Sequence, residues 1–221
     1  MYYNYSWMIG NGEFSVVSGE EMEKNHSAYG IFGEIVPFNE NMSIGNPIAD
    51  FLSIQYIEER LRSLNTSFLI YNVKVLSKLA LIPKNKPVHL VFGYDMVCSI
   101  NLLSLLGMLD YKGYTNEFYI HILDEDTMKE KEYYRLFSKG FYELYLLNVV
   151  SRIKTLTPIK SINNSLDKYY LYKTYDKNEL LGMLNDYEKP IDALKKHREY
   201  GLSIEEWQKW LDSINELDSI K

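Results

Sequence analysis

The stretch that most constrains the fold runs from Pro87 to Asp110 and has the sequence PVHLVFGYDMVCSINLLSLLGMLD. It begins with a short apolar run, passes through a turn that contains Gly93, and ends in a segment that would be apolar on nearly every face of a helix. A strand with apolar residues on both faces is typical of the middle of a sheet that is covered on both sides. The stretch therefore predicts an α/β fold with a buried strand followed by a buried helix.

A second strand is predicted over Glu117–Leu123, which has the sequence EFYIHIL. Strand, helix and strand together occupy about forty residues, which is enough for two parallel strands joined by a crossover helix. We therefore expect a small, mostly parallel sheet flanked by helices.

The segment before this unit is predicted to be rich in strands over residues 1–45. Asn11 and Gly12 precede the apolar run Phe14–Val17, and an Asn-Gly pair beside such a run is typical of a hairpin turn. Asn46 followed by Pro47 predicts the start of an amphipathic helix, with Asn as the N-cap and Pro in the first turn. Residues 67–81 fit either a strand or a helix.

The chain after Thr127 is predicted to be helical. The expected helices cover residues 137–150, 165–175, 177–187, 191–200 and 204–217. Ser203 and Glu206 form the capping-box pattern of a helix start. We predict an α/β domain over residues 1–154 and a helical C-terminal segment over residues 155–221 that packs on it.

Composition limits the classes of function. With 221 residues, 46% of them hydrophobic, the chain can bury one substantial core. Its net charge of −6 disfavours nucleic acid as a partner, because phosphate neutralisation needs a surplus of Lys and Arg. A single cysteine, Cys98, favours a reducing compartment. The sequence shows neither a secretory signal nor an apolar run of membrane-spanning length, so we expect a cytoplasmic protein without a membrane partner. Its 20 tyrosines favour a surface compatible with a homodimer.

Polar residues follow both predicted strands where each strand ends. Gly93, Tyr94 and Asp95 follow the first strand, and Asp124 and Asp126 follow the second. Ligands of open parallel sheets gather at the carboxyl ends of strands, and hard divalent cations prefer several carboxylate oxygens. Asp95, Asp124 and Asp126 are therefore candidate ligands of a divalent cation, the one cofactor that the sequence suggests. The alternative is that these aspartates cap the helices and turns that follow them.

Three further residues are candidate ligand-binding groups, together with Gly93, Tyr94 and Asp95. His89 and His121 lie in the two strands and are expected to face each other across the sheet, either as a site or as structural histidines. Asn101 lies within an apolar helix and must form a hydrogen bond if it is buried. That bond could belong to a ligand or to a neighbouring segment.

Residues 201–210, with the sequence GLSIEEWQKW, have the turn glycine, the N-cap serine and the apolar spacing of a helix-turn-helix recognition helix. Lys196 and His197 stand where the first helix of such a unit would carry small apolar residues. Amphipathic packing of Trp207 and Trp210 is the alternative.

The segment FGYDMVCSINLLSLLGMLDYKGY, with ILDEDT after it, resembles a family of uncharacterised bacterial proteins built on a strand, the sequence Phe-Gly-(Tyr/Asp/Glu)-Asp and a helix. Some of these proteins carry an AraC-type transcriptional-regulator label. The resemblance covers Pro87 to Thr127 and the C-terminal half in outline. It implies an α/β domain with a helical C-terminal part, and it implies no particular activity or catalytic residue.

Three functions follow from these observations, in decreasing order of support. The first is non-catalytic binding of a protein partner or small ligand, because no activated nucleophile, metal cluster or phosphate loop is evident. The second is a cation-dependent enzyme that acts on a phosphorylated or nucleotide-activated substrate. The third is a DNA-binding regulator that uses the C-terminal helix-turn-helix-like segment.

Overall fold

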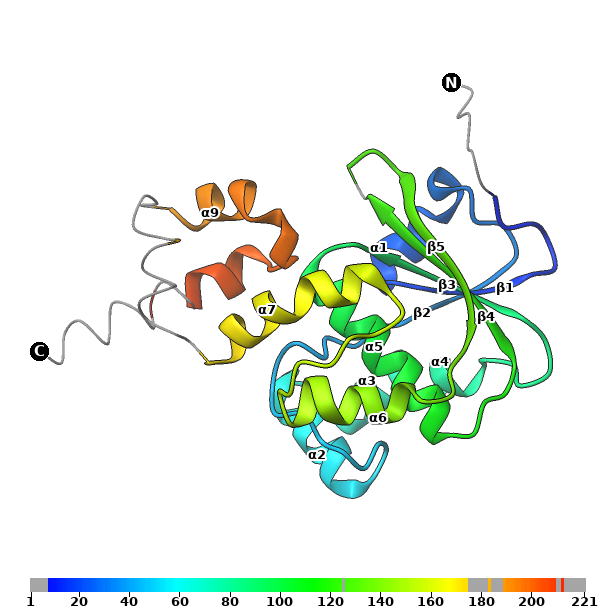
Figure 1. Ribbon diagram of the computed structural model, residues 1–221, viewed down its shortest axis with the longest axis horizontal. Helices are drawn as coiled ribbons and strands as arrows, with labels where there is room; N and C mark the ends of the chain where they lie inside the picture. Colours follow the sequence, from blue (N-terminus) through cyan, green and yellow to red (C-terminus); the bar gives the residue numbers. More distant parts are fainter. Residues whose placement is uncertain (1–7, 125, 175–182, 184–188, 210–211, 213–221) are drawn as a thin grey trace, which may run out of the picture.

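A computed structural model of the chain describes residues 8–124, 126–174, 183, 189–209 and 212 (Figure 1). The strands are β1 (Phe14–Val17), β2 (Glu34–Pro37), β3 (Val88–Gly93), β4 (Glu117–Asp124) and β5 (Lys129–Phe137). The α-helices are α1 (Gly19–Lys24), α2 (Ile54–Ser63), α3 (Phe68–Tyr71), α4 (Ser77–Ala80), α5 (Met96–Tyr111), α6 (Phe141–Tyr145), α7 (Lys160–Thr174) and α9 (Pro190–Lys196). Two 3-10 segments, η1 (His26–Tyr29) and η4 (Arg198–Tyr200), and two π-helical segments, η2 (Asn72–Leu76) and η3 (Leu146–Val150), complete the described elements.

The strands form one sheet in the order β2-β1-β3-β4-β5, and the prediction of a mostly parallel sheet flanked by helices is confirmed. The first four strands are parallel, and β5 runs antiparallel to β4. The predicted unit of two strands and a crossover helix is β3–α5–β4, in which Val88 pairs with Phe118 and Gly93 with Leu123.

The two faces of the sheet differ in their cover. Alternate residues of β1, β3 and β4, including Val16, Leu90 and Ile120, contribute to the main core beneath α5. Helices α6 and α7 pack against α5 in turn (Figure 1). α5 is therefore enclosed on nearly all sides, which explains why its sequence shows no polar face. The opposite face carries a smaller apolar cluster with Val17, Met22 and Val91, beside α1.

The predicted N-terminal hairpin is wrong. All four residues of β1 are buried, and the strand lies between β2 and β3 with both neighbours parallel. A strand in that place is apolar on both faces, as β3 is, so its sequence does not distinguish it from a short hairpin strand. Asn11 and Gly12 do form a turn, but the segment before it bridges in parallel to Ile31 through Ile9.

The helix predicted to start at Asn46 begins instead at Ile54, with Ser53 as its N-cap. The Ser53 hydroxyl accepts a hydrogen bond from the Tyr56 backbone N–H at 3.1 Å. Phe51 explains the delay, because its ring is buried among the rings of Tyr56, Tyr111, Tyr142 and Tyr145. This aromatic cluster holds the preceding residues in an irregular path that local capping signals do not predict.

The region after β4 also differs from expectation. Lys129–Phe137 is a strand that the sequence analysis missed, and the helix predicted from residue 137 begins at Phe141. The missed strand is an edge strand with the polar sequence KEKEYYRLF, and charged residues are common on such edges. The ambiguous residues 67–81 are helical, through α3, η2 and α4.

The C-terminal helices agree with expectation where they are described. α7 packs on α5, and the Ser165 hydroxyl donates a hydrogen bond to the Ser99 hydroxyl at 3.1 Å. The Ser203–Glu206 capping box forms in both directions. Most of the helix predicted over residues 177–187, Trp210, and residues 213–217 lie outside the described residues. The division of the chain at residues 154 and 155 stays a prediction.

Candidate functional site

Asp95 is the N-cap of α5, as one of its two interpretations predicted. Its Oδ1 accepts a hydrogen bond from the Cys98 backbone N–H at 2.9 Å. Burial raises the pKa of the Asp95 carboxyl, while the hydrogen bonds from Cys98 lower it. Gly201 lies so close that a Cβ on it would overlap Asp95 Oδ1. The chain itself therefore fills the space around this carboxyl group.

Gly93 and Tyr94, which precede the cap, are also engaged within the chain. Gly93 is the last residue of β3 and pairs with Leu123 of β4. The Tyr94 ring is covered by Lys131, whose Nζ lies 3.5 Å from the ring centroid.

Asp124 and Asp126 each have their own partners. Asp124 Oδ1 accepts hydrogen bonds from the backbone N–H groups of Asp126 and Thr127, and Oδ2 pairs with Lys131 Nζ at 2.9 Å. The hydrogen bond from Lys131 is the main cause that lowers the pKa of Asp124. Asp126 pairs with Arg198 at 2.5 Å. Within the described ranges, no group of three or more His, Cys, Asp or Glu side chains is arranged to hold a metal ion. The structure therefore places the three predicted cation ligands in separate contacts.

Asn101 forms its hydrogen bonds with a neighbouring segment. Its Oδ1 accepts from the Met42 backbone N–H at 2.7 Å, and its Nδ2 donates to the Glu40 carbonyl at 2.8 Å. The Glu40 side chain is itself buried against Arg60, at 2.9 Å, and accepts a hydrogen bond from Tyr71. Asn101 thus anchors the segment before α2 to the central helix.

His89 and His121 meet on the face of the sheet opposite α5, as predicted. His89 Nδ1 lies 2.9 Å from His121 Nε2, and the ring planes are 17° apart. His121 Nδ1 lies 2.6 Å from Glu130 Oε1, and His89 Nε2 lies 3.6 Å from Glu13 Oε1. Two histidines and two carboxylates thus form a row that crosses the sheet from the segment before β1 to β5.

The protonation of this row follows from its hydrogen bonds. An ionised Glu130 can only accept, so His121 carries its proton on Nδ1, and its Nε2 accepts the proton that His89 carries on Nδ1. The pKa of each histidine is lowered to about 4, mainly by burial, and the charge of His121 contributes to the lowering at His89. Beside His89 on β1, the buried Ser15 hydroxyl has no hydrogen-bond partner among the described residues. The pair is therefore neutral at pH 7 and sensitive to acid.

A large cavity lies at the other end of α5, away from all of the predicted site residues. It is an apolar pocket of about 580 Å³ between α2, the helical stretch α3–η2–α4 and the C-terminal end of α5. That volume is within the range of small-molecule sites. The pocket is lined by Leu52, Ile57, Phe68, Leu76, Leu79, Ala80, Lys84, Met108, Leu109, Lys112 and Tyr114.

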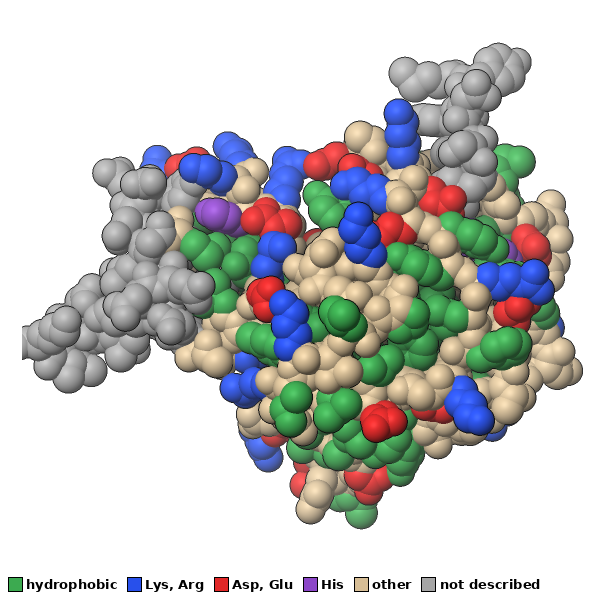
Figure 2. Space-filling model, in the orientation of Figure 1, with side chains coloured by type: hydrophobic (Ala, Val, Ile, Leu, Met, Phe, Trp, Pro, Cys, Tyr) green, Lys and Arg blue, Asp and Glu red, His purple; other side chains and the backbone are tan. Residues whose placement is uncertain are grey.

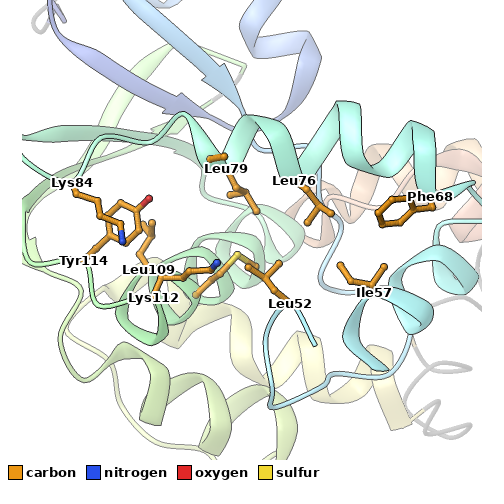
Figure 3. A pocket seen from close by; sticks show the side chains of 11 residues that line it. Leu52, Ile57, Phe68, Leu76, Leu79, Lys84, Leu109, Lys112 and Tyr114 are labelled. Carbon is orange, nitrogen blue, oxygen red and sulfur yellow. The ribbon is translucent and has the colours of Figure 1, made fainter. Parts of the chain in front are cut away.

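Two lysines supply the charge of this pocket. Figure 3 shows Phe68 and Ile57 at one end and Lys84 beside Tyr114 at the other, with Lys112 reaching in from the same side as Lys84. Lys84 Nζ lies 5.0 Å from the centroid of the Tyr114 ring. The Tyr114 hydroxyl donates a hydrogen bond to the Ile82 carbonyl at 3.1 Å, so the ring is fixed in place. Within the part of the chain that the structure describes, neither lysine has a carboxylate partner.

The sequence analysis missed these pocket residues. The available signal was a stretch without a single Asp or Glu, residues 60–94, in a chain that has 30 acidic residues. The π-helical segment η2, which contributes Leu76 to the pocket, has no clear sequence pattern. π-helical turns are rare and are frequent at functional sites, so η2 adds support for this location.

Comparison of the chain with protein-family models, curated proteins and solved structures finds no match. The resemblance to the uncharacterised bacterial family therefore stays a prediction. In the described parts of the chain, no helix has both the length and the apolar character to cross a membrane.

Proposed function

We propose that this protein binds a small amphiphilic anion, a molecule with an alkyl or acyl chain and a negatively charged head group, in the pocket at the C-terminal end of α5. The single observation that carries the proposal is the pairing of an apolar cavity with Lys84 and Lys112, which have no carboxylate partner among the described residues. This proposal keeps small-ligand binding as the function and moves it from the polar strand ends to the opposite end of the central helix.

The chemistry of the lining supports this class of ligand. Leu52, Ile57, Leu79 and Leu109 offer aliphatic contacts to a chain, and burial of each CH₂ group contributes about 0.8 kcal/mol. A carboxylate, sulfate or phosphate head would pair with the lysines, each of which is a compact, mobile point charge. A polar ligand without a chain would leave the apolar lining in contact with water.

The test is calorimetric titration with three ligands that share one alkyl chain: dodecanoate, dodecanol and dodecyltrimethylammonium. We expect dodecanoate to bind most tightly, dodecanol more weakly, and the cationic ligand most weakly. The double variant Lys84→Gln, Lys112→Gln should weaken dodecanoate binding by about tenfold, which is 1.4 kcal/mol, and leave dodecanol binding nearly unchanged.

The matched control is Lys129→Gln, which removes one positive charge on β5, outside the pocket lining. It should bind all three ligands as the native protein does. Ala80→Phe adds bulk to the lining and should weaken dodecanoate and dodecanol together. The absence of saturable binding by all three ligands would contradict the proposal, as would equal loss of dodecanoate binding in the control.

A further inference from the structure

The helical stretch α3–η2–α4 exposes an unusual number of large apolar side chains. Phe68, Leu69, Ile70, Val73 and Leu81 are between 50% and 72% exposed. The same stretch buries Tyr71 and Val75, at 1% and 3% exposure, so its inner face is already packed on the core. We call the five exposed residues the outer stripe. At least half of each of these side chains is open to solvent.

The segment that carries the outer stripe is basic in sequence. Between residues 63 and 94 the charged residues are all lysines: Lys74, Lys78, Lys84 and Lys86. Lys74 and Lys86 also pair with Glu20 and Glu34, at 2.9 and 3.6 Å, while Lys78 and Lys84 have no ion pair within the described ranges. This concentration of positive charge is notable because the whole chain has a net charge of −6. A helix with apolar residues on one side and lysines at its borders is typical of segments that lie in the interface of an anionic membrane.

We infer that the outer stripe docks this protein on the surface of an anionic lipid bilayer. The apolar side chains would enter the boundary between head groups and acyl chains, and the lysines would face the lipid phosphates. Charge distinguishes this occupant from a second copy of the chain, because a symmetric dimer through the stripe would bring lysines of both copies together at the same interface. Peripheral docking requires no membrane-spanning helix, so it agrees with the absence of one in the described residues.

The position of the pocket fits this inference, and this step rests on the proposed function. Phe68 belongs to the outer stripe and also lines the pocket, and Leu76, Leu79 and Ala80 of the same helical stretch line it too. On the face in Figure 2, hydrophobic side chains are grouped below α7, over α2 and α6. A ligand with an acyl chain could therefore pass from the bilayer into the pocket along side chains of one helix.

The experiment is co-sedimentation with vesicles of phosphatidylcholine alone and of phosphatidylcholine mixed with phosphatidylglycerol. We expect the native protein to bind the anionic vesicles and to bind the neutral ones weakly. The double variant Leu69→Ser, Val73→Ser should lower the bound fraction on anionic vesicles by about fivefold or more. Lys74→Gln with Lys78→Gln should weaken the same binding and reduce its dependence on salt.

A matched control is available in the chain. Leu156 and Ile153 are 74% and 57% exposed, against 72% and 57% for Leu69 and Val73, but they follow η3 and lie outside the outer stripe. Leu156→Ser with Ile153→Ser should bind anionic vesicles as the native protein does. Circular dichroism of every variant confirms that the fold is retained.

Three outcomes would overturn the inference. They are no binding to anionic vesicles, equal loss in the control variant, and a homodimer that dissociates in Leu69→Ser, Val73→Ser while vesicles bind neither form. Leu69 and Val73 do not line the pocket, so dodecanoate titration of that variant separates the two proposals. If this variant still binds dodecanoate but no longer binds vesicles, both proposals are supported. If the native protein binds dodecanoate but not anionic vesicles, the membrane-docking inference is wrong and the proposed ligand site stands.

Discussion

The two ends of α5 differ in what surrounds them, although they belong to one buried helix. At its start, Asp95 caps the helix, Gly201 packs against the cap, and Lys131 covers Tyr94. At its end, Leu109 and Lys112 border an open apolar pocket with positive charge at one side. The start is rich in polar side chains, yet these satisfy one another, as buried polar groups generally do. In α5, the polar side chains therefore lie at the end where the chain itself supplies their partners. The end that is open to a ligand is marked by an unfilled apolar pocket.

The largest expected effect compares two leucines of α5 that lie one turn apart. Leu105→Ala should destabilise the protein by about 3 kcal/mol, because Leu105 is fully buried and its removal leaves a cavity. Leu109→Ala should cost about half as much, because Leu109 lines the pocket and the vacated space joins a volume that is already present. Urea denaturation of both variants measures the difference. Equal costs would mean that the pocket end is packed as tightly as the rest of the helix.

The next comparison uses two glycines with similar backbone conformations at opposite ends of α5. Gly201 has φ +67° and lies against Asp95, whereas Gly113 has φ +71° and has no atom within 4 Å of the Cβ position. Gly113→Ala should cost about 1 kcal/mol from backbone strain alone. Gly201→Ala should cost about 2 kcal/mol or more, because its methyl group also displaces the cap. Thermal unfolding of the two variants measures the difference. Equal losses of stability would show that Asp95 can move away from the new methyl group at no cost.

A smaller effect tests whether Asp95 is a cap or a ligand. Asp95→Ala should cost about 1 kcal/mol, and Asp95→Asn only a few tenths, because Asn caps a helix nearly as well as Asp. The thermal unfolding midpoint of the native protein and of Asp95→Asn should respond equally to millimolar Mg²⁺ or Mn²⁺. If either cation stabilises the native protein and Asp95→Asn abolishes that effect, the ends of β3 and β4 would instead be a metal site.

The smallest effect concerns the contribution of His89 and His121 to stability, which is absent at neutral pH and appears when the pH is lowered. The pKa values of His89 and His121 are about 4 in the folded sheet and near 6.5 when the chain unfolds, so the unfolded chain binds more protons between these values. Burial also raises the pKa of Glu130, so the folded protein can bind one proton there that the unfolded chain does not. That single proton offsets only part of the two protons that the histidines bind in the unfolded chain. Stability should therefore fall as the pH is lowered from about 6.5 to about 4.

Urea denaturation at a series of pH values measures this loss of stability. His89→Gln with His121→Gln should flatten the profile in that window, whereas the half-buried His26, whose ring contacts the Ile31 carbonyl, serves as the control position. NMR titration of the ring protons follows the two histidines directly. An unchanged pH profile in the double variant would contradict the role assigned to the pair.

The sequence predicted the central part of this fold well, and it did so for a physical reason. β3, α5 and most of β4 are buried, so burial alone dictates an apolar run whose length separates strand from helix. Elements at the margins were predicted poorly because distant contacts determine them. β1 was assigned to the wrong kind of strand pair, β5 was missed, and the start of α2 is displaced by the contacts of Phe51.

The candidate site could be predicted only in part. The contact between His89 and His121 follows from the parallel register of two neighbouring strands, and the cap at Asp95 follows from its place after a strand. The pocket combines residues from α2, α4 and α5 that are more than fifty positions apart at the extremes, such as Ile57 and Leu109. No local pattern encodes how far apart those helices stand, so the cavity is a property of the tertiary arrangement alone.

The π-helical segment η2 sets the rotational phase of the helix that bounds the pocket. Phe68 and Leu76 both line the pocket although eight residues separate them, which is about 80° around a regular α-helix. The Ser77 backbone N–H bonds to the Asn72 carbonyl across five residues, and this wider turn brings the two side chains closer to one line. Deletion of one residue within Asn72–Leu76 would restore a regular turn and leave seven steps between the two side chains, about 20° short of two full turns, so their alignment should be kept. The π-helical turn thus lets the stretch contain one extra residue and still present one continuous wall to a ligand.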